Sequence, residues 1–217
     1  MDNLQKARLN MIHSQVRPWD VRDEKVLNMM NTIPREQFVP KEFEDVAYSD
    51  CAIPLNETHK MLAPKVVARA LQALAIQPTE TALEIGTGTG YVTALLSHLA
   101  NHVYSIEIDP MLLNIAKRNL SQGYKNVTLE LGNAVFGWQS HAPYAVIFVS
   151  GSYPLGLPTA LETQILPGGR CFAIIGQEPN MQAVLYTRTS KRLKPEVLFE
   201  TSSAALLHAP HPQEFTF

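Results

Sequence analysis

Apolar side chains recur about one helical turn apart along the first part of the chain. Within residues 4–16 they stand at positions 4, 7, 11, 12 and 16, a spacing that predicts a helix. Pro18 ends this run, because proline disfavours helical backbone at the residue before it. Further helices are predicted over 23–33 and over 64–77, where Pro64 takes the first position, at which a missing N–H costs nothing. Residues 1–63 are therefore expected to form a mostly helical extension that ends in a loop.

From residue 81 onward, short apolar runs alternate with helical periods. The predicted strands cover 81–85, 102–108, 127–131, 144–150 and 169–176, and the predicted helices cover 90–100, 110–123 and 158–166. Strands that alternate with helices predict an α/β fold with a Rossmann-like, doubly wound, mostly parallel sheet. Alternating apolar and polar residues over 183–207 predict an antiparallel hairpin at the sheet edge. Residues 64–217 would form this domain, packed with the extension as one compact unit.

Composition and charge disfavour several classes of protein. Hydrophobic residues make up 46% of the 217 residues and charged residues 18%, which is typical of a globular chain. The net charge is −2 and no run of five like charges occurs, so no nucleic-acid partner is expected. Cys51 and Cys171 lie outside any metal-binding pattern, so no metal is expected. The N-terminus lacks a signal-like apolar core and no apolar run reaches about 18 residues, so we expect a cytoplasmic protein without a membrane partner.

The segment "LEIGTGTGY" (residues 83–91) follows a predicted strand and opens a helix, the context in which a glycine motif carries meaning. Gly86 and Gly88 allow a tight turn that approaches a ligand, and Gly90 lets the helix pack near the strand. The spacing differs from the G-x-G-x-x-G that binds a pyrophosphate, which disfavours a nicotinamide-dependent dehydrogenase. S-adenosylmethionine carries no phosphate, and Glu84 stands where an acid could meet its ammonium group.

Polar side chains also follow the next two strands. Glu107 lies 21 residues after Gly86, close to the spacing at which an acidic residue binds ribose hydroxyls. Asn133 follows the third strand, where its amide oxygen could accept a hydrogen bond from the adenine amino group. Ligands of open α/β sheets bind at the carboxyl ends of the strands, so these side chains and the glycine turn are expected to share one site for S-adenosyl-L-methionine.

With these motifs the chain resembles the class I S-adenosylmethionine-dependent methyltransferases, and more narrowly the protein-L-isoaspartate O-methyltransferase family. The resemblance extends over about residues 7–188. Besides the glycine turn it rests on the segments "MIHSQVRPWDVRDEKVLNMMNTIPREQFVP", "VAYSDCAIPL", "YAVIFVSGSYPLGLP" and "LPGGR", which follow in the family's order. The N-terminal segment is the most specific, because many methyltransferases share the glycine turn.

The resemblance implies an enzyme that methylates isoaspartyl carboxylates for protein repair, with isoaspartyl-containing peptides or proteins as partners. It implies that Asp50 lies near the acceptor and that Ser150, which ends the fourth strand, faces the transferred methyl group. Glu107 would bind the ribose, and Asn133 would lie beside the adenine, where the family more often has aspartate. The residues that would line the methionine end of the cofactor are Glu84, Gly86, Thr87, Gly88 and Gly90.

The acceptor loop departs from the family pattern. The family reads Gly-x-Gly-Gln-Thr-Ile-Ser-x-Pro there, and its serine hydroxyl lies near the reacting carboxylate. When Pro64 is aligned with the final proline, Leu62 takes the serine position, and a leucine side chain cannot form a hydrogen bond. Thr58, His59 and Lys60 take the Gly, Gln and Thr positions. His59 or Lys60 is therefore a candidate to hold an anionic acceptor.

Loss of one hydroxyl need not abolish methyl transfer to a carboxylate. A carboxylate with a pKa of about 4 is ionised at pH 7 and needs no general base, so positioning and removal of water supply most of the catalysis. A lost hydrogen bond of about 1–3 kcal/mol would slow the reaction about ten- to a hundredfold. Two alternatives stay open: a methyltransferase of the same fold with a different small or anionic acceptor, and a non-catalytic homologue that binds S-adenosylmethionine or S-adenosylhomocysteine.

Overall fold

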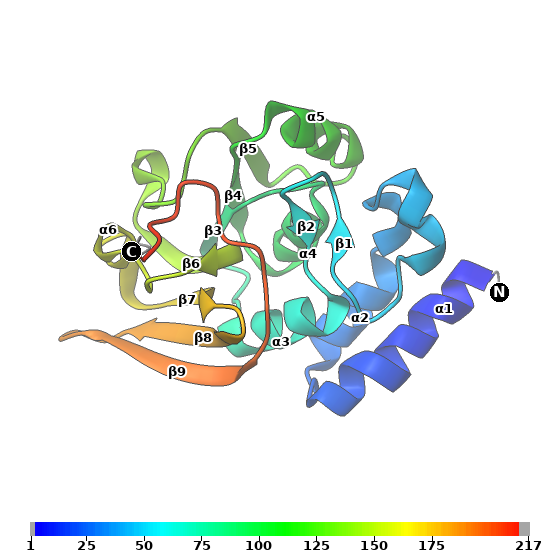
Figure 1. Ribbon diagram of the computed structural model, residues 1–217, viewed down its shortest axis with the longest axis horizontal. Helices are drawn as coiled ribbons and strands as arrows, with labels where there is room; N and C mark the ends of the chain where they lie inside the picture. Colours follow the sequence, from blue (N-terminus) through cyan, green and yellow to red (C-terminus); the bar gives the residue numbers. More distant parts are fainter. Residues whose placement is uncertain (1–2, 213–217) are drawn as a thin grey trace, which may run out of the picture.

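A seven-stranded sheet, in the order β5-β4-β3-β6-β7-β8-β9, runs through the centre of the molecule (Figure 1). The structure is a computed structural model, and it describes residues 3–212. Strands β5 to β7 of this order are parallel, and β8 and β9 add two antiparallel strands at one edge. The strands are β3 (Thr81–Ile85), β4 (His102–Glu107), β5 (Val127–Leu131), β6 (Tyr144–Tyr153), β7 (Ile165–Gln177), β8 (Asn180–Arg188) and β9 (Leu193–Glu200). The predicted α/β fold with a mostly parallel sheet and an antiparallel edge is confirmed.

Side-chain caps and prolines fix where the main helices begin. Asp23 precedes α2 and accepts a hydrogen bond from the Lys25 N–H, and Asp109 precedes α5 and accepts from the Met111 N–H. Both α3 and α5 have proline at the first position, which for α3 is the predicted Pro64. The helices are α1 (Asn3–Met11), α2 (Glu24–Thr32), α3 (Pro64–Leu74), α4 (Tyr91–Leu99), α5 (Pro110–Asn119) and α6 (Thr159–Glu162).

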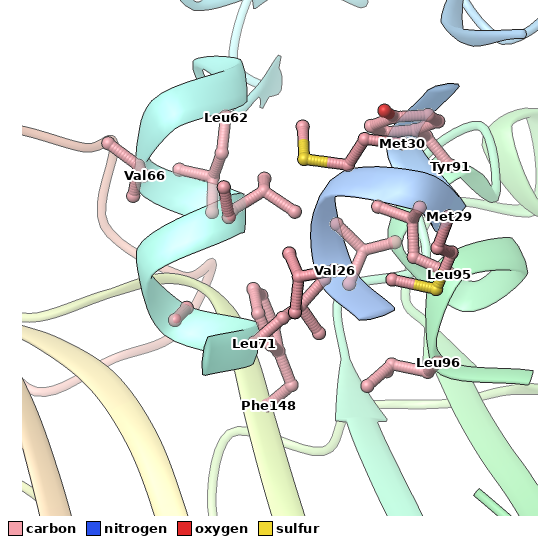
Figure 2. Close-up of a cluster of buried hydrophobic side chains, with 14 of the residues drawn as sticks. Val26, Met29, Met30, Leu62, Val66, Leu71, Tyr91, Leu95, Leu96 and Phe148 are labelled. Atoms are coloured by element: carbon pink, nitrogen blue, oxygen red, sulfur yellow. The ribbon is translucent and has the colours of Figure 1, made fainter. Parts of the chain in front are cut away.

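Side chains on the two faces of the sheet enter two hydrophobic clusters. Along β3, Ala82 belongs to the first cluster and Leu83 to the second, as the alternation of side chains along a strand requires. The first cluster also contains the buried faces of α2, α3 and α4, and Figure 2 shows Leu62 in this cluster together with Met30 and Tyr91. The helical extension and the sheet therefore share one core.

Trp19 attaches the helical extension to the edge of the sheet. Its ring packs edge-on against Phe199 of β9, with 5.5 Å between the ring centroids, and the Lys65 ammonium lies 4.1 Å from the centre of the Trp19 ring. Arg69 of α3 donates a hydrogen bond to the Trp19 carbonyl at 3.1 Å and lies over the Phe199 ring. The extension, α3 and the last strand therefore hold one another.

The region between β6 and β7 differs from the prediction. The helix predicted over 158–166 is a single turn, α6, and β7 begins at Ile165 rather than at residue 169. Gly168, with a φ of +81°, lets the strand bend, and the pairing of β7 with β6 shifts register between Tyr144 and Val146. A turn at 163–164 and the first two residues of β7 therefore replace the end of the predicted helix.

The C-terminal hairpin is present but shorter than the predicted 183–207. Strand β9 ends at Glu200, and the chain then turns back towards the end of β6, where Ser152 pairs with Ala205 (Figure 1). This return brings residues 203–207 to the carboxyl end of the sheet.

Candidate active site

The candidate site lies at the carboxyl end of the sheet, where the strand order reverses. β4 pairs with one side of β3 and β6 with the other, which leaves a crevice at the strand ends. A main cavity occupies this crevice, lined by the hairpin 53–61, the glycine turn, the ends of β4 to β6, and residues 203–207. An adjoining inner cavity lies between the same hairpin and the glycine turn. We call residues 53–61 the acceptor hairpin.

The glycine turn has backbone conformations that favour glycine. Gly86, Gly88 and Gly90 have φ of +90°, +56° and +94°. Gly86 and Gly88 line both cavities, and a Cβ at Gly88 would lie 3.0 Å from Leu55 of the acceptor hairpin. Gly90 is absent from both linings: it begins α4, and a Cβ there would lie 2.9 Å from Leu120. Two of the three glycines thus bring the backbone to the cavities, and the third permits close packing of α4.

Glu84 of β3 is fully buried at the inner cavity. Its Oε2 accepts hydrogen bonds from Thr93 Oγ1 (2.5 Å) and Ser105 Oγ (2.6 Å), whereas Oε1 has no partner among the described residues. Burial raises the pKa of Glu84 to about 8, against the effect of the two hydroxyl donors. Thr87 turns inward, with its Oγ1 2.6 Å from Ser105 Oγ, so it supports this network. A ligand ammonium would give Oε1 both a hydrogen bond and an opposite charge.

Unpartnered polar atoms gather at the inner cavity. Across residues 3–212, six buried side-chain oxygen or nitrogen atoms have no hydrogen-bond partner, and four of them belong to residues in this lining. The four atoms are Glu84 Oε1, Thr89 Oγ1, Tyr91 OH and Ser150 Oγ. Because buried polar groups are normally paired, this concentration is typical of a site built for a polar ligand.

Glu107 lies at the end of β4 and lines the main cavity, as the spacing predicts. Its Oε2 accepts from the Gly88 N–H at 2.7 Å, and its Oε1 accepts from the N–H groups of Ile108 (2.9 Å) and Asp109 (3.0 Å). These bonds fix the carboxylate beside the glycine turn, where ribose hydroxyls could reach its remaining lone pairs.

Asn133 follows β5 and also lines the main cavity, in an exposed position. Its Oδ1 accepts from the Val135 N–H at 3.1 Å, which leaves a second lone pair for a ligand amine. Ser150, near the end of β6, lines both cavities. The predicted strand-end residues thus meet at one edge of the sheet.

The acceptor hairpin pairs β1 (Ile53–Pro54) with β2 (Lys60–Met61). The Asn56 side chain holds its tip, because Oδ1 accepts from the N–H groups of Thr58 (2.9 Å) and His59 (2.7 Å). Asn56 Nδ2 donates to Asp109 Oδ2 at 3.1 Å. The hairpin is therefore tied to the start of α5 at the rim of the main cavity.

His59 and Lys60 both line the main cavity, and Lys60 also lines the inner cavity. His59 Nδ1 lies 3.0 Å from Asn56 Oδ1 and 2.9 Å from Thr58 Oγ1, so one ring nitrogen is engaged within the hairpin. Lys60 is exposed, and its ammonium has no hydrogen bond or ion pair with any residue from 3 to 212. A cation without a partner therefore stands at the junction of the two cavities.

Leu62 belongs to the first hydrophobic cluster (Figure 2), with 5% of its surface exposed, and it also lines the inner cavity. Its carbonyl accepts a hydrogen bond from Arg35 Nη2 at 2.9 Å, and Arg35 Nε donates to the Ala47 carbonyl at 2.9 Å. Arg35 is fully buried 4.9 Å from the centre of the Tyr91 ring, and burial lowers the pKa of its guanidinium. This arginine, which no sequence motif indicates, fixes the backbone between the hairpin and α3.

Asp50 lines neither cavity. Its carboxylate accepts a hydrogen bond from Lys65 Nζ at 2.6 Å, and the same ammonium lies over the Trp19 ring. In this structure Asp50 belongs to the contacts that hold the extension against α3, and the other predicted site residues, Gly90 excepted, line the cavities without it.

Residues 203–207 line the main cavity, and the sequence pattern gives no indication of this role. Ser152 exchanges backbone hydrogen bonds of 3.0 Å with Ala204 and Leu206. Leu206 lies against Gly151, where a Cβ would be 2.7 Å from Leu206 Cδ2. Small serine and alanine residues after a strand carry no motif, and only the fold of the chain brings them to the site.

The residues at the two cavities fit S-adenosylmethionine. Gly86 and Gly88 open the backbone to a ligand, Glu84 Oε1 lacks a donor, and Glu107 and Asn133 offer acceptors further along the crevice. The glycine spacing of this turn, G-x-G-x-G, differs from the G-x-G-x-x-G spacing that places a pyrophosphate at a helix N-terminus. The fold and site together define a class I S-adenosylmethionine-dependent methyltransferase.

Comparisons with known sequences identify the family. A sequence profile described as "Protein-L-isoaspartate(D-aspartate) O-methyltransferase (PCMT)" matches residues 7–206. The chain is 38% identical to the protein-L-isoaspartate O-methyltransferase of Syntrophus aciditrophicus (strain SB) over 192 residues, and this aligned region covers 88% of each chain. It is 40% identical over 182 residues to that of Koribacter versatilis (strain Ellin345), which covers 83% of this chain and 81% of the relative. The chain belongs to the protein-L-isoaspartate(D-aspartate) O-methyltransferase family.

Solved structures agree with this assignment. A protein-L-isoaspartate O-methyltransferase superposes with a TM-score of 0.77 at 25% identity over 92% of this chain, which spans 65% of that longer protein. A Plasmodium falciparum structure described as a protein-L-isoaspartate O-methyltransferase with S-adenosyl-L-homocysteine gives 0.76 at 18% identity, and covers 95% of this chain and 99% of that one. The second likeness shows the fold alone.

Residues 3–212 contain neither a cluster of metal ligands nor a membrane-spanning helix. No group of three or more histidine, cysteine, aspartate or glutamate side chains could hold a metal ion. No helix in the described part of the chain combines the length and the apolar character needed to span a membrane.

Proposed function

We propose that this protein transfers a methyl group from S-adenosylmethionine to the free carboxylate of isoaspartyl residues in peptides and proteins. The observation that carries the proposal is that the glycine turn and the acceptor hairpin line the same cavity, with Leu55 of the hairpin against Gly88 of the turn. Membership of the family supports it, because the relatives with 38–40% identity are named for this activity.

In the proposed reaction an oxygen of the acceptor carboxylate bonds to the methyl carbon while the carbon–sulfur bond breaks, which yields a methyl ester and S-adenosylhomocysteine. When bound, S-adenosylmethionine supplies the electrophilic methyl group on its sulfonium. The carboxylate, with a pKa of about 4, is already ionised and needs no base. The protein therefore contributes position and exclusion of water: Glu84 and Glu107 orient the cofactor, and the acceptor hairpin and residues 203–207 border the cavity.

The test uses the purified protein with methyl-labelled S-adenosylmethionine and an isoaspartyl peptide. The same peptide with a normal aspartyl residue is the control. We expect base-labile methyl ester on the isoaspartyl peptide well above the control. Equal labelling of both peptides would contradict the assignment of isoaspartyl residues as the acceptor. Cofactor binding without methyl transfer to either peptide would indicate a non-catalytic protein that binds the cofactor.

A further inference from the structure

We infer that Lys60 is the residue that binds the acceptor carboxylate in this protein. The inference rests on the proposed function and assigns a specificity-determining residue within its site. Leu62 stands where the family's acceptor loop has its serine, and its apolar side chain, which is buried and lines the inner cavity, has no hydroxyl to offer. The acceptor carboxylate needs another partner, and Lys60 stands two residues away on β2 of the same hairpin.

The charges around the two cavities single out Lys60. It is the one lysine or arginine among the residues that line either cavity in the described part of the chain. The carboxylates in these linings are Glu84 and Glu107, and the one other side chain there that can carry a positive charge is His59. The Nδ1 of His59 is engaged with Asn56 and Thr58 of its own hairpin, so Lys60 is the cation free to meet an anionic acceptor. A carboxylate that leaves water needs an opposite charge or several hydrogen bonds.

The ammonium of Lys60 is available for this role. Other lysines and arginines near the hairpin are engaged: Lys65 pairs with Asp50 at 2.6 Å, and Arg35 is buried with its hydrogen bonds directed at backbone carbonyls. Lys60 has no partner among residues 3–212.

The backbone that carries Lys60 is held on several sides. Residue 60 pairs with Pro54 across the hairpin, Asn56 ties the tip to Asp109, and Arg35 holds the Leu62 carbonyl. Only the flexible side chain needs to order when a carboxylate binds. A charge on a fixed backbone costs less entropy to position than one on a mobile loop.

The exposure of Lys60 distinguishes the acceptor from the cofactor's own carboxylate. Glu84 and Ser150 Oγ, which suit the methionine end of the cofactor, are buried in the lining of the inner cavity. Lys60 is exposed on the hairpin, where a residue within a large polypeptide can reach it. A protein substrate approaches from solvent, so the exposed cation serves the acceptor.

The experiment measures binding of a fluorescent isoaspartyl peptide to the full-length protein in the presence of S-adenosylhomocysteine. A peptide with the neutral isoasparaginyl side chain is the ligand control. We expect the wild type to prefer the carboxylate peptide, and Lys60→Met to weaken its binding about tenfold, the usual effect of losing one charge-assisted hydrogen bond. Lys60→Arg should restore most of the affinity. Lys125→Met removes an exposed charge just before the amino end of β5, away from the cavities, and should change nothing.

The affinity for S-adenosylhomocysteine, measured by calorimetry, provides the second readout. Lys60→Met should leave it within about twofold, because the inference assigns Lys60 to the acceptor. An equal loss of cofactor affinity would assign Lys60 to the cofactor carboxylate and overturn the inference. So would unchanged peptide binding by Lys60→Met, or a wild type that does not prefer the carboxylate peptide. A wild type that binds the isoaspartyl peptide through Lys60 without methylating it would support the inference and contradict the proposed function.

Discussion

We expect Glu84 to couple the protonation of the site to the binding of its cofactor. In the folded protein burial raises the Glu84 pKa to about 8, from an ordinary value of 4.5. A raised carboxyl pKa stabilises the cofactor-free fold below about pH 4.5, and this contribution is lost as the pH rises towards 8. Because an ammonium ligand needs the ionised form, affinity for S-adenosylhomocysteine should rise between pH 6 and pH 8, by at most about tenfold per pH unit.

Calorimetry at several pH values checks this dependence. Glu84→Gln should bind more weakly and lose the pH slope, since a neutral amide cannot ionise. Glu107→Gln removes a carboxylate from the same cavity and should weaken binding while keeping the slope. A slope that persists in Glu84→Gln would show that another group controls it.

Gly88 tests whether backbone approach, rather than turn stability, matters for the cofactor. Gly88→Ala should weaken S-adenosylhomocysteine binding about tenfold or more, because the residue has a φ of +56° at the cavity and its Cβ would lie 3.0 Å from Leu55. Gly123→Ala is the matched control: its φ is +91° with no atom within 4 Å of the added Cβ. Urea unfolding should show a loss of about 1–3 kcal/mol for the control, with unchanged cofactor affinity.

The sequence predicts those site residues that depend on local chemistry. Gly88 and Glu107 could be assigned because a glycine turn and a strand end place them regardless of the rest of the fold. Arg35 could not, because nothing in "PREQF" shows that this guanidinium will be buried against Tyr91. The sequence likewise does not predict that the hydroxyls of Thr89 and Tyr91 are buried without a hydrogen-bond partner, because their burial depends on how the chain folds around the glycine turn.

Among the elements, the acceptor hairpin has a contact that can be altered without disturbing its turn. Asn56→Asp keeps the oxygen that accepts from Thr58 and His59 but replaces the donor to Asp109 with a second carboxylate. We expect dissociation of S-adenosylhomocysteine to become about fivefold faster, the effect of about 1 kcal/mol. Stopped-flow displacement measures this rate.

The exchange of donor and acceptor supplies the control for the hairpin contact. The double variant Asn56→Asp with Asp109→Asn returns an amide opposite a carboxylate, and asparagine also caps helices such as α5. Its dissociation rate should return towards the wild-type value. A double variant as fast as the single one would show that the contact does not restrain the hairpin.

Elements with clear periodicity were predictable, and those set by distant packing were not. Strands 81–85 and 127–131 are bounded by turns and agree with β3 and β5. The helix predicted over 158–166 was wrong from residue 163 onward, because a turn follows α6 and the apolar residues 165 and 166 begin the irregular strand paired to β6. Residues 203–207 show no hydrophobic periodicity from which their position could be predicted, and their path depends on backbone hydrogen bonds to Ser152.

At the scale of the whole molecule, the extension and the sheet should unfold together, because the first hydrophobic cluster includes both. The chain has two tryptophans, Trp19 in the extension and Trp138 beyond β5. Trp138→Phe and Trp19→Phe each leave one reporter. The fluorescence transitions of the two variants in urea, each compared with its own circular dichroism, should coincide. Separate midpoints within one variant would divide the molecule into two units.

The contact between Asn56 and Asp109 has a consequence for the way ligands enter and leave the crevice. It ties the tip of the acceptor hairpin to the residue before α5, and both the hairpin and the glycine turn line the main cavity. We expect a ligand on the hairpin side of this cavity to slow the exchange of a ligand held at the glycine turn. The two ligands would then bind in a fixed order, with the one at the glycine turn first.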